Sequence, residues 1–272
     1  MHPYWLALPL WATVLALWWP GRALFCSALA LTLAIAVGGG WLAGWALPLL
    51  GAGWWLGRRL ERQPHWLWHA LLVVWVLSGA LHGWPGLNNP LLLDSVKASA
   101  RSTPYSLYLN LDKTIVGLAL LSGAAWRAAR STPWRWHPGL IVLPPVLVLL
   151  LWLACAAGLI APEPGCPTWA PLWAVCNLLL TCVAEEAFFR FYLQRRLAGA
   201  CGHPMLAVVV AALAFGLAHL GGGGSYAALA TLAGVCYGLA YQWSGRLEAA
   251  IVLHFLFNAA HLCGFTYPLL RP

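Results

Sequence analysis

The chain has 272 residues, of which 62% are hydrophobic and only 8% are charged, and its mean hydropathy is +0.75. A soluble domain carries roughly 25% charged residues, so this composition excludes an ordinary soluble protein and predicts an integral, multi-pass membrane protein. The formal net charge of +8 does not indicate nucleic-acid binding, because basic residues in short loops usually determine membrane topology. We expect an all-α, polytopic transmembrane helix bundle of about eight to ten spans.

Apolar stretches follow one another along the chain and are interpreted as helices that cross or enter the bilayer. They lie at about 4–19, 23–38, 41–57, 66–83, 105–125, 139–161, 169–193, 204–219, 226–243 and 247–265. The N-terminus lacks a basic region and a cleavage site, so it is interpreted as the start of the first helix. A cytoplasmic linker at 127–138 separates the N-terminal transmembrane helices, 1–138, from a C-terminal helical core, 139–272, within one continuous membrane domain.

Basic residues in the loops predict which side of the membrane each helix end faces. If successive loops alternate sides, ten arginines fall on one side and four basic residues on the other, with Arg190 inside a helix. The richer side holds Arg22, Arg58, Arg59, Arg62, Arg127, Arg130, Arg135, Arg195, Arg196 and Arg246, and the poorer side holds Lys97, Arg101, Lys113 and Arg271. The positive-inside rule therefore puts both termini outside the cytoplasm.

The longest polar connection, residues 84–104, is expected to form a loop with a short interfacial helix. The stretch after it begins with Asn110, Asp112 and Lys113, which either snorkel at the interface or line a substrate entrance.

Six of the eight cysteines lie in apolar stretches, and Cys166 and Cys201 lie in loops. Because there is no CxxC pair, the sequence predicts neither a disulfide framework nor a cysteine-based zinc site.

Two adjacent glutamates, Glu185 and Glu186, lie with Arg190 inside an apolar stretch, although the chain has only 7 acidic residues. On an α-helix, residues four apart lie on one face about 6 Å from each other, so Arg190 is expected to anchor Glu186. Glu185 is turned by about 100° from Glu186, which leaves Arg190 poorly placed to neutralise it. A carboxylate at this depth is expected to face water or a polar group on another helix, which is the environment of a general base.

Polar residues recur on two later helices. Residues 215–219 read FGLAH and end at His219, and residues 254–258 read HFLFN, so His254 and Asn258 share a helix face. A single histidine in such a helix is more often a packing residue. Three polar clusters on helices that otherwise contain almost no ionisable side chain are instead expected to face one another or a water-filled cavity.

These clusters resemble, in order and spacing, the three motifs of the CAAX-protease and bacteriocin-processing family, also called the CPBP or abortive-infection family. The matching residues are Glu185 and Glu186 with Arg190, then Phe215 with His219, then His254 with Asn258. The resemblance covers about residues 139–265 and makes 139–272 the CPBP-like catalytic core. Its best-known members are the type II CAAX prenyl endopeptidases, and some bacterial relatives process C-terminal sorting signals.

The resemblance implies an intramembrane endopeptidase of the glutamic type. By this likeness Glu185 activates water with His219 as its partner, Glu186 and Arg190 support the site, and His254 and Asn258 stabilise the oxyanion. It also implies a mechanism that uses no metal and no other cofactor. The alternative is zinc held by Glu185, His219 and His254, although the HExxH motif is absent.

The expected substrate is a membrane-anchored or lipidated protein that is cut near its C-terminus. Because His219 is predicted at the outer end of its helix, the site is expected to open outward, which favours anchored surface proteins of a bacterial inner membrane. The expected partners are this substrate and the lipid bilayer, with no nucleic acid. The alternatives are a non-enzymatic membrane scaffold or immunity factor on the same fold, and a proton-coupled transporter, for which the sequence shows no inverted repeat.

Overall fold

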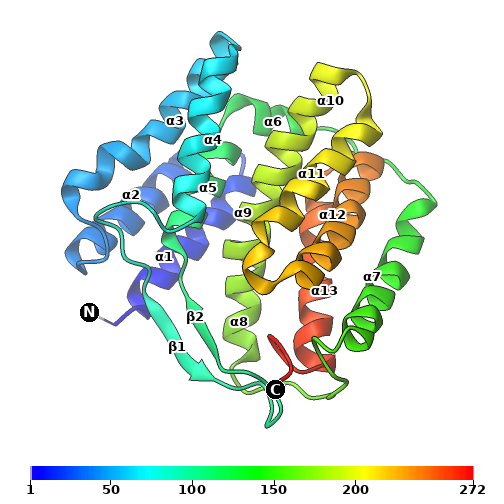
Figure 1. Cartoon of the computed structure of the whole chain (residues 1–272). Coiled ribbons are helices and arrows are strands. Elements are labelled where there is room, and N and C mark those ends of the chain that lie inside the picture. Colours follow the sequence, from blue (N-terminus) through cyan, green and yellow to red (C-terminus); the bar gives the residue numbers. More distant parts are fainter. Residues whose placement is uncertain (1, 272) are drawn as a thin grey trace. The chain divides into compact units, whose positions relative to one another are not determined.

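The structure is a computed structural model that describes residues 2–271, and it is 71% helical (Figure 1). This confirms the predicted all-α, polytopic membrane fold, and each predicted apolar stretch corresponds to a helix. The helices are α1 (Tyr4–Leu15), α2 (Arg22–Gly38), α3 (Leu47–Arg62), α4 (Trp66–Ala80), α5 (Leu111–Leu121), α6 (Ala124–Arg130), α7 (Gly139–Ala156), α8 (Ala170–Cys176), α9 (Val183–Glu186), α10 (Arg195–Cys201), α11 (Pro204–Ala218), α12 (Gly224–Ser244) and α13 (Leu247–Gly264).

Within the described residues, three helical segments have both the length and the hydropathy needed to cross a bilayer. They are Gly139–Ala156, Ala170–Cys201 and Leu247–Gly264. Four other apolar helices are shorter, at Tyr4–Trp18, Arg22–Gly38, Trp66–Ala80 and Pro204–Ala218. The outer face of α7 is apolar, with Ile141 64% and Leu149 56% exposed, as expected for side chains that contact lipid.

The polar connection after α4 differs from the expected loop with a short interfacial helix. It contains strand β1 (Leu91–Val96), which is hydrogen-bonded to strand β2 (Tyr105–Tyr108) (Figure 1). The stretch predicted to be helical from residue 105 therefore begins as a strand, and α5 starts only at Leu111. Aromatic and branched side chains favour strands, and pairing across a sheet is a non-local interaction that the local turn signals do not report.

The chain forms two compact units, each built from segments that are separated along the sequence. Unit 1 comprises residues 1–92, 107–131 and 179–188, and unit 2 comprises residues 93–106, 132–178 and 189–272.

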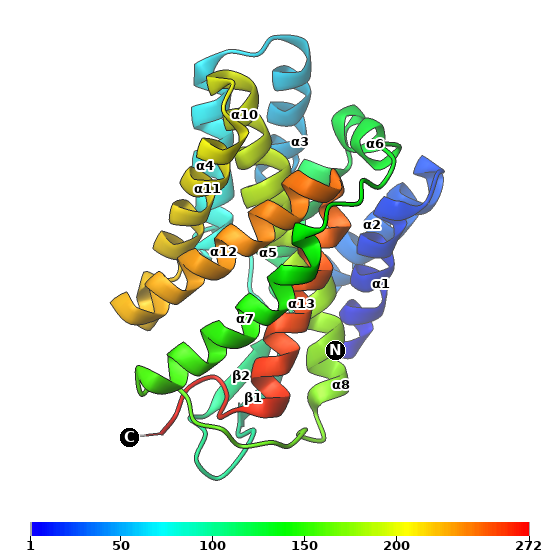
Figure 2. The same ribbon diagram turned by 90° about the vertical axis from the view of Figure 1, so that its right-hand side faces the viewer.

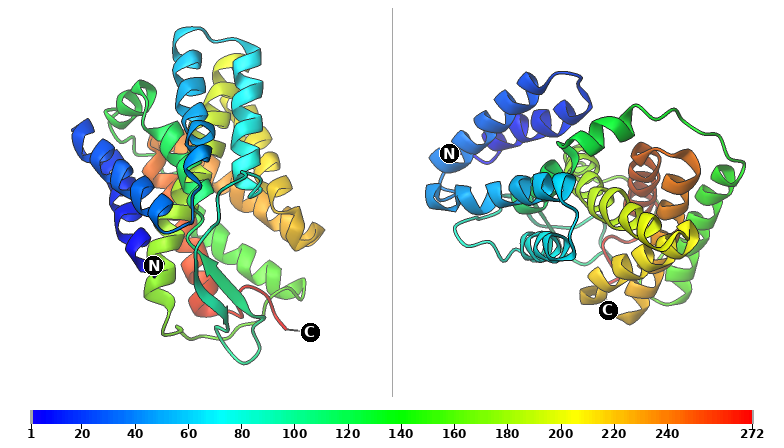
Figure 3. Two further views of the ribbon diagram at one scale, coloured as in Figure 1. Left: turned by 90° about the vertical axis from the view of Figure 1, so that its left-hand side faces the viewer. Right: turned by 90° about the horizontal axis from the view of Figure 1, so that it is seen from above.

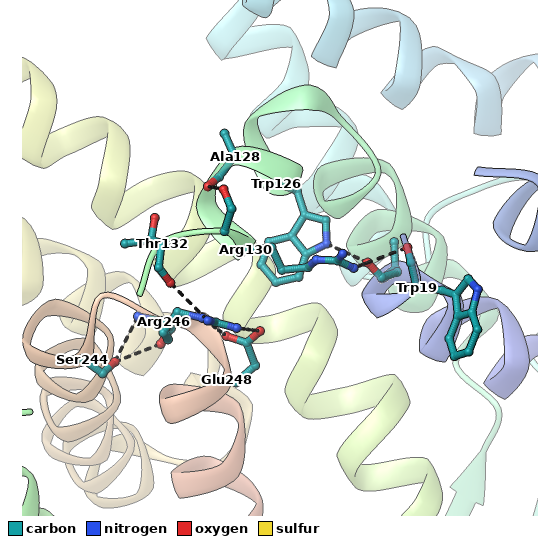
Figure 4. Close-up of polar contacts among 10 residues, drawn as sticks. Trp19, Trp126, Ala128, Arg130, Thr132, Ser244, Arg246 and Glu248 are labelled. Atoms are coloured by element: carbon teal, nitrogen blue, oxygen red, sulfur yellow. Dashed lines mark hydrogen bonds and ion pairs between the residues drawn. The ribbon is translucent and has the colours of Figure 1, made fainter. Parts of the chain in front are cut away.

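Helices α1 and α2 of unit 1 lie side by side (Figure 3). They share a buried contact between two threonine hydroxyls. The Thr13 and Thr32 hydroxyls are 3.0 Å apart. The Thr13 hydroxyl also lies 2.7 Å from the carbonyl oxygen of Pro9, and the Thr32 hydroxyl lies 2.8 Å from that of Ala28. The indole of Trp126 and the guanidinium of Arg130 both donate to the carbonyl of Leu17 (Figure 4). These contacts fasten α6 to the end of the first helical segment, where a helix leaves its last backbone carbonyls without a donor of its own.

Asp112, at the start of α5 in unit 1, is only 1% exposed. Its carboxylate lies 2.7 Å from Nδ1 of His82 and accepts a hydrogen bond of 2.9 Å from the Asn89 side chain. The side-chain amide oxygen of Asn89 in turn accepts from the backbone N–H of Leu111. Asp112 therefore does not snorkel at the interface, and instead it fastens the segment after α4 to the N-terminus of α5.

Helices α7, α12 and α13 of unit 2 pack side by side (Figure 2). At one end of this group, Arg246 donates to the carbonyl of Thr132 and pairs with Glu248 at 2.9 Å (Figure 4). Arg135 donates to the carbonyls of Ser244 and Gln242 beside it. The predicted linker is therefore tied to the junction of α12 and α13, where Gly245 adopts a left-handed conformation with φ of 72° that a side chain would disfavour.

Candidate active site

The two glutamates lie on a single helical segment, Ala170–Cys201, that is not uniformly α-helical. Residues Asn177–Cys182 and Ala187–Gln194 are π-helical, and the α-helical turn Val183–Glu186 lies between them. A π-helix closes its hydrogen bonds five residues apart, not four, and such segments occur often at functional sites. The spacing argument that pairs Glu186 with Arg190 assumed an α-helix throughout, so sequence spacing by itself does not decide which glutamate faces Arg190.

Glu185 and Glu186 belong to unit 1, and they differ in burial. Glu186 is fully buried, whereas Glu185 is only partly buried. The turn that carries them packs on α5, where a Cβ added to Gly117 would lie 3.0 Å from the Cα of Ala184. The small residues Gly117 and Ala184 thus let two backbones approach closely, which is typical of helix contacts in membranes.

Arg190 is fully buried in unit 2, and its contacts include residues of α11 and α12. Its guanidinium donates a hydrogen bond of 2.9 Å to the carbonyl of Gly234. The same group lies 4.8 Å from the ring centre of Phe215 and 5.3 Å from that of Tyr237. A cation held over two aromatic faces and a carbonyl is stabilised in an apolar interior, so Arg190 organises the aromatic residues around the site.

His219 is the residue that follows the last turn of α11, and it is half-buried. Its Nδ1 lies 2.7 Å from the carbonyl oxygen of Phe215, and its ring centre is 4.5 Å from the Phe215 ring. A carbonyl can only accept, so Nδ1 carries a hydrogen, and in the neutral tautomer this leaves Nε2 as the acceptor. The four-residue spacing of Phe215 and His219 in FGLAH therefore fixes the tautomer of the histidine.

His254 is 4% exposed and lies inside α13. Its ring stacks on Tyr237, with ring centres 4.5 Å apart, and meets the edge of Phe215 at 5.7 Å. These two aromatic residues fix the plane of the imidazole. The stacked contact therefore gives Tyr237 a role in orienting a candidate site residue.

Asn258 lies one turn after His254 and is partly buried. Its amide nitrogen donates a hydrogen bond of 3.2 Å to the side-chain oxygen of Asn177, which is 9% exposed. Sequence reasoning missed Asn177. The available signal was a polar residue in the apolar run LWAVCNLLL, eight positions before Glu185.

A cavity of about 80 Å³ lies within unit 2 and brings the later motifs together. Its polar lining consists of His219, Tyr226, Tyr237, His254, Asn258 and His261. The rest of the wall consists of apolar side chains of α7, α12 and α13, of the Leu159–Ile160 segment, and of Phe215 and Leu269. One water needs roughly 10–15 Å³ of such space and two to four polar partners, so the cavity can hold several waters beside the three predicted residues His219, His254 and Asn258.

Within either unit, the described residues contain no group of three His, Cys, Asp or Glu side chains that could hold a metal ion. The candidate cavity offers two predicted histidines, His219 and His254, and His261 beside them. His261 lies 3.2 Å from the carbonyl of Thr266 and packs against Tyr267.

The comparison with protein families gives one match. Residues 167–260 match the model described as "Rce1-like: Type II CAAX prenyl endopeptidase Rce1-like". The matched segment lies within residues 139–265, where the sequence predicted the resemblance. It contains all the motif residues from Glu185 to Asn258. No curated protein and no solved structure matches the chain significantly.

Proposed function

We propose that this integral membrane protein is an intramembrane endopeptidase, because residues 167–260 match the model of Rce1-like type II CAAX prenyl endopeptidases. It hydrolyses a peptide bond near the C-terminus of a membrane-anchored protein. The observation that carries the proposal is the convergence of His219, His254 and Asn258 on one cavity with room for water. Burying polar groups of this kind inside a membrane protein costs free energy, and where they occur they usually mark a site of binding or catalysis.

In the proposed reaction Glu185 is the general base. It takes one proton from water while the water oxygen attacks the scissile carbonyl carbon. The second hydrogen stays on that oxygen and donates a hydrogen bond to Nε2 of His219. The hydrogen bond from Nδ1 to the Phe215 carbonyl supports this role, since it leaves Nε2 as the acceptor. The proton held by Glu185 then passes to the departing amine as the C–N bond breaks, so water and peptide give one carboxylic acid and one amine.

Asn258 and His254 are the proposed donors to the oxyanion of the tetrahedral intermediate. An asparagine amide nitrogen carries two hydrogens, and one of these donates to Asn177, which fixes the direction of the other. The His254 ring is held in one plane by Tyr237, so its N–H keeps a constant direction. Donors that are oriented before the reaction stabilise developing charge without a reorganisation cost.

Glu186 and Arg190 are proposed to support the site rather than to react. The contacts of Arg190 with Phe215, Tyr237 and the Gly234 carbonyl support this role, because the same aromatic residues hold His219 and His254.

The proposed mechanism uses no metal. Activity that survives exhaustive chelation of a metal-free preparation would support it, and activity restored only by added zinc would favour the zinc alternative.

The proposed substrates are proteins whose C-terminal tail combines a short motif, a spanning helix and a basic end. The position of the cavity supports this choice, because its lining includes Leu159, Ile160 and Leu269, which lie at the end of unit 2 opposite Arg135 and Arg246. A cysteine placed at position 219 should therefore react with a membrane-impermeant reagent added from outside. Labelling from the cytoplasm alone would show that the cavity opens inward.

The decisive experiment compares the C-termini of membrane proteins in cells that express the wild type, Glu185→Gln or Glu61→Gln. Glu61 is an exposed glutamate of α3 and provides the matched control. We expect processed C-termini with the wild type and with Glu61→Gln, and full-length substrate with Glu185→Gln at equal protein levels. Unchanged processing by Glu185→Gln would leave the scaffold or immunity-factor alternative as the better account.

A further inference from the structure

Two cysteines that are 97 positions apart in the chain meet in unit 2. The sulfur of Cys166, in the segment between α7 and α8, lies 2.6 Å from the sulfur of Cys263, in the last turn of α13. This is closer than two thiol sulfurs ordinarily approach without a bond, and a disulfide has a length of about 2.05 Å.

The backbone around both cysteines is paired, so their approach does not depend on side-chain rotation alone. The N–H of Gly165 donates to the carbonyl of Cys263 at 2.9 Å, and the N–H of Glu163 donates to the carbonyl of Gly264 at 2.9 Å. Pro162 and Phe265 form an antiparallel bridge beside them. Two segments held in this register keep their Cβ atoms within reach of each other, which is the geometric condition for a disulfide.

The location of the pair also matters for its redox state. Helices α7 and α13 both run from the end that holds Arg135 and Arg246 to the end that holds Cys166 and Cys263. The charge distribution puts the arginine-rich end in the cytoplasm, so the cysteine pair lies on the other side of the membrane. Disulfides form and persist in such extracytoplasmic compartments.

We propose that Cys166 and Cys263 form a disulfide that clamps the segment 157–169 to the end of α13. Both thiols lose their hydrogens and two electrons, and an extracytoplasmic protein disulfide accepts them by thiol–disulfide exchange and is reduced to two thiols. The clamped segment carries Leu159 and Ile160, which line the candidate cavity. The bond therefore holds part of the cavity wall in place, and this inference does not depend on the proposed protease activity.

The first test uses the wild-type protein. Thiols are alkylated in intact cells with N-ethylmaleimide, and the purified protein is digested with pepsin at acid pH without reductant and analysed by mass spectrometry. We expect a peptide that joins Cys166 to Cys263, whereas the exposed cysteines Cys26 and Cys201 carry the alkyl group. Recovery of Cys166 and Cys263 as alkylated thiols would overturn the proposal.

A second test measures hydrogen exchange in residues 265–270. The N–H groups of Thr266 and Leu270 donate to the carbonyls of Ala161 and Leu159, so they report whether the clamped segment stays in place. Reduction should speed exchange in the wild type and in the control Cys201→Ser, and Cys166→Ser should exchange fast with or without reductant. Equal exchange in all three proteins, before and after reduction, would show that no bond is present.

Discussion

The imidazole of His254 stacks on the phenol ring of Tyr237, with ring centres 4.5 Å apart and ring planes 14° apart. The other contacts of Tyr237 include the guanidinium of Arg190, 5.3 Å from the ring centre, and the edge of Phe215 at 6.0 Å. One tyrosine of α12 thus connects a candidate oxyanion donor on α13 to a buried cation. Tyr237 and its neighbours thus orient the proposed reacting groups, and this role can be tested separately from the chemistry of those groups.

Replacing Tyr237 by leucine should slow peptide hydrolysis without abolishing it. An aromatic pair contributes roughly 0.5–1.5 kcal/mol beyond burial, so loss of the stack should lower kcat about twofold to tenfold. Tyr237→Phe keeps the ring and should retain more activity than Tyr237→Leu. The measurement is single-turnover cleavage of a processed substrate in proteoliposomes, and equal rates for the two variants would show that the stack does not orient His254.

Asn258 and Asn177 should differ in how strongly they affect catalysis. Asn258→Ala removes a proposed oxyanion donor and should lower kcat about 10²- to 10³-fold with little change in KM. Asn177→Ala removes only the group that accepts the 3.2 Å hydrogen bond from Asn258, so the loss should be about tenfold or less. Asn177→Asp keeps an acceptor and should recover activity relative to Asn177→Ala. A larger loss of kcat for Asn177→Ala than for Asn258→Ala would contradict the assignment of Asn258 as the oxyanion donor and of Asn177 as the residue that orients it.

Arg190 should matter for stability as well as for activity. Arg190→Met leaves the Gly234 carbonyl without its charged donor and removes the cation from the Phe215 and Tyr237 rings. The combined loss should be about 2–4 kcal/mol of unfolding free energy, seen as a lower Tm in detergent. Arg101→Met, which changes an exposed arginine of unit 2, provides the control and should leave Tm unchanged.

Gly216 allows α11 and α12 to pack closely. A Cβ at this position would overlap the Thr231 hydroxyl and lie 2.7 Å from the carbonyl of Ala227. Gly216→Ala should therefore lower stability by about 1–3 kcal/mol through overpacking. The matched control is Gly199→Ala in α10, where nothing lies within 4 Å of the added Cβ. That change should be neutral or stabilising, because alanine favours the helix over glycine.

The apolar composition could predict the membrane class, the helical content and the positions of the helices, because twenty-residue apolar runs allow few other structures in a bilayer. The motif residues also predicted the likeness to the CAAX endopeptidases, because the segment that matches the Rce1-like family model contains all of them from Glu185 to Asn258. It did not predict the strands β1 and β2, the burial of Asp112 against His82, or the π-helical turns around the glutamates. Each of these depends on hydrogen bonds or packing that local residue preferences do not encode.

The candidate site divides in the same way. The sequence by itself determined which residues are chemically able to act, because Glu185, His219, His254 and Asn258 are rare polar groups in an apolar chain. Only the tertiary structure decided that His219, His254 and Asn258 line one cavity, that Phe215 fixes the tautomer of His219, and that Asn177 and Tyr237 orient their neighbours. The physical reason is that motif spacing fixes relations along one helix, whereas a cavity and its hydrogen bonds arise from packing between helices.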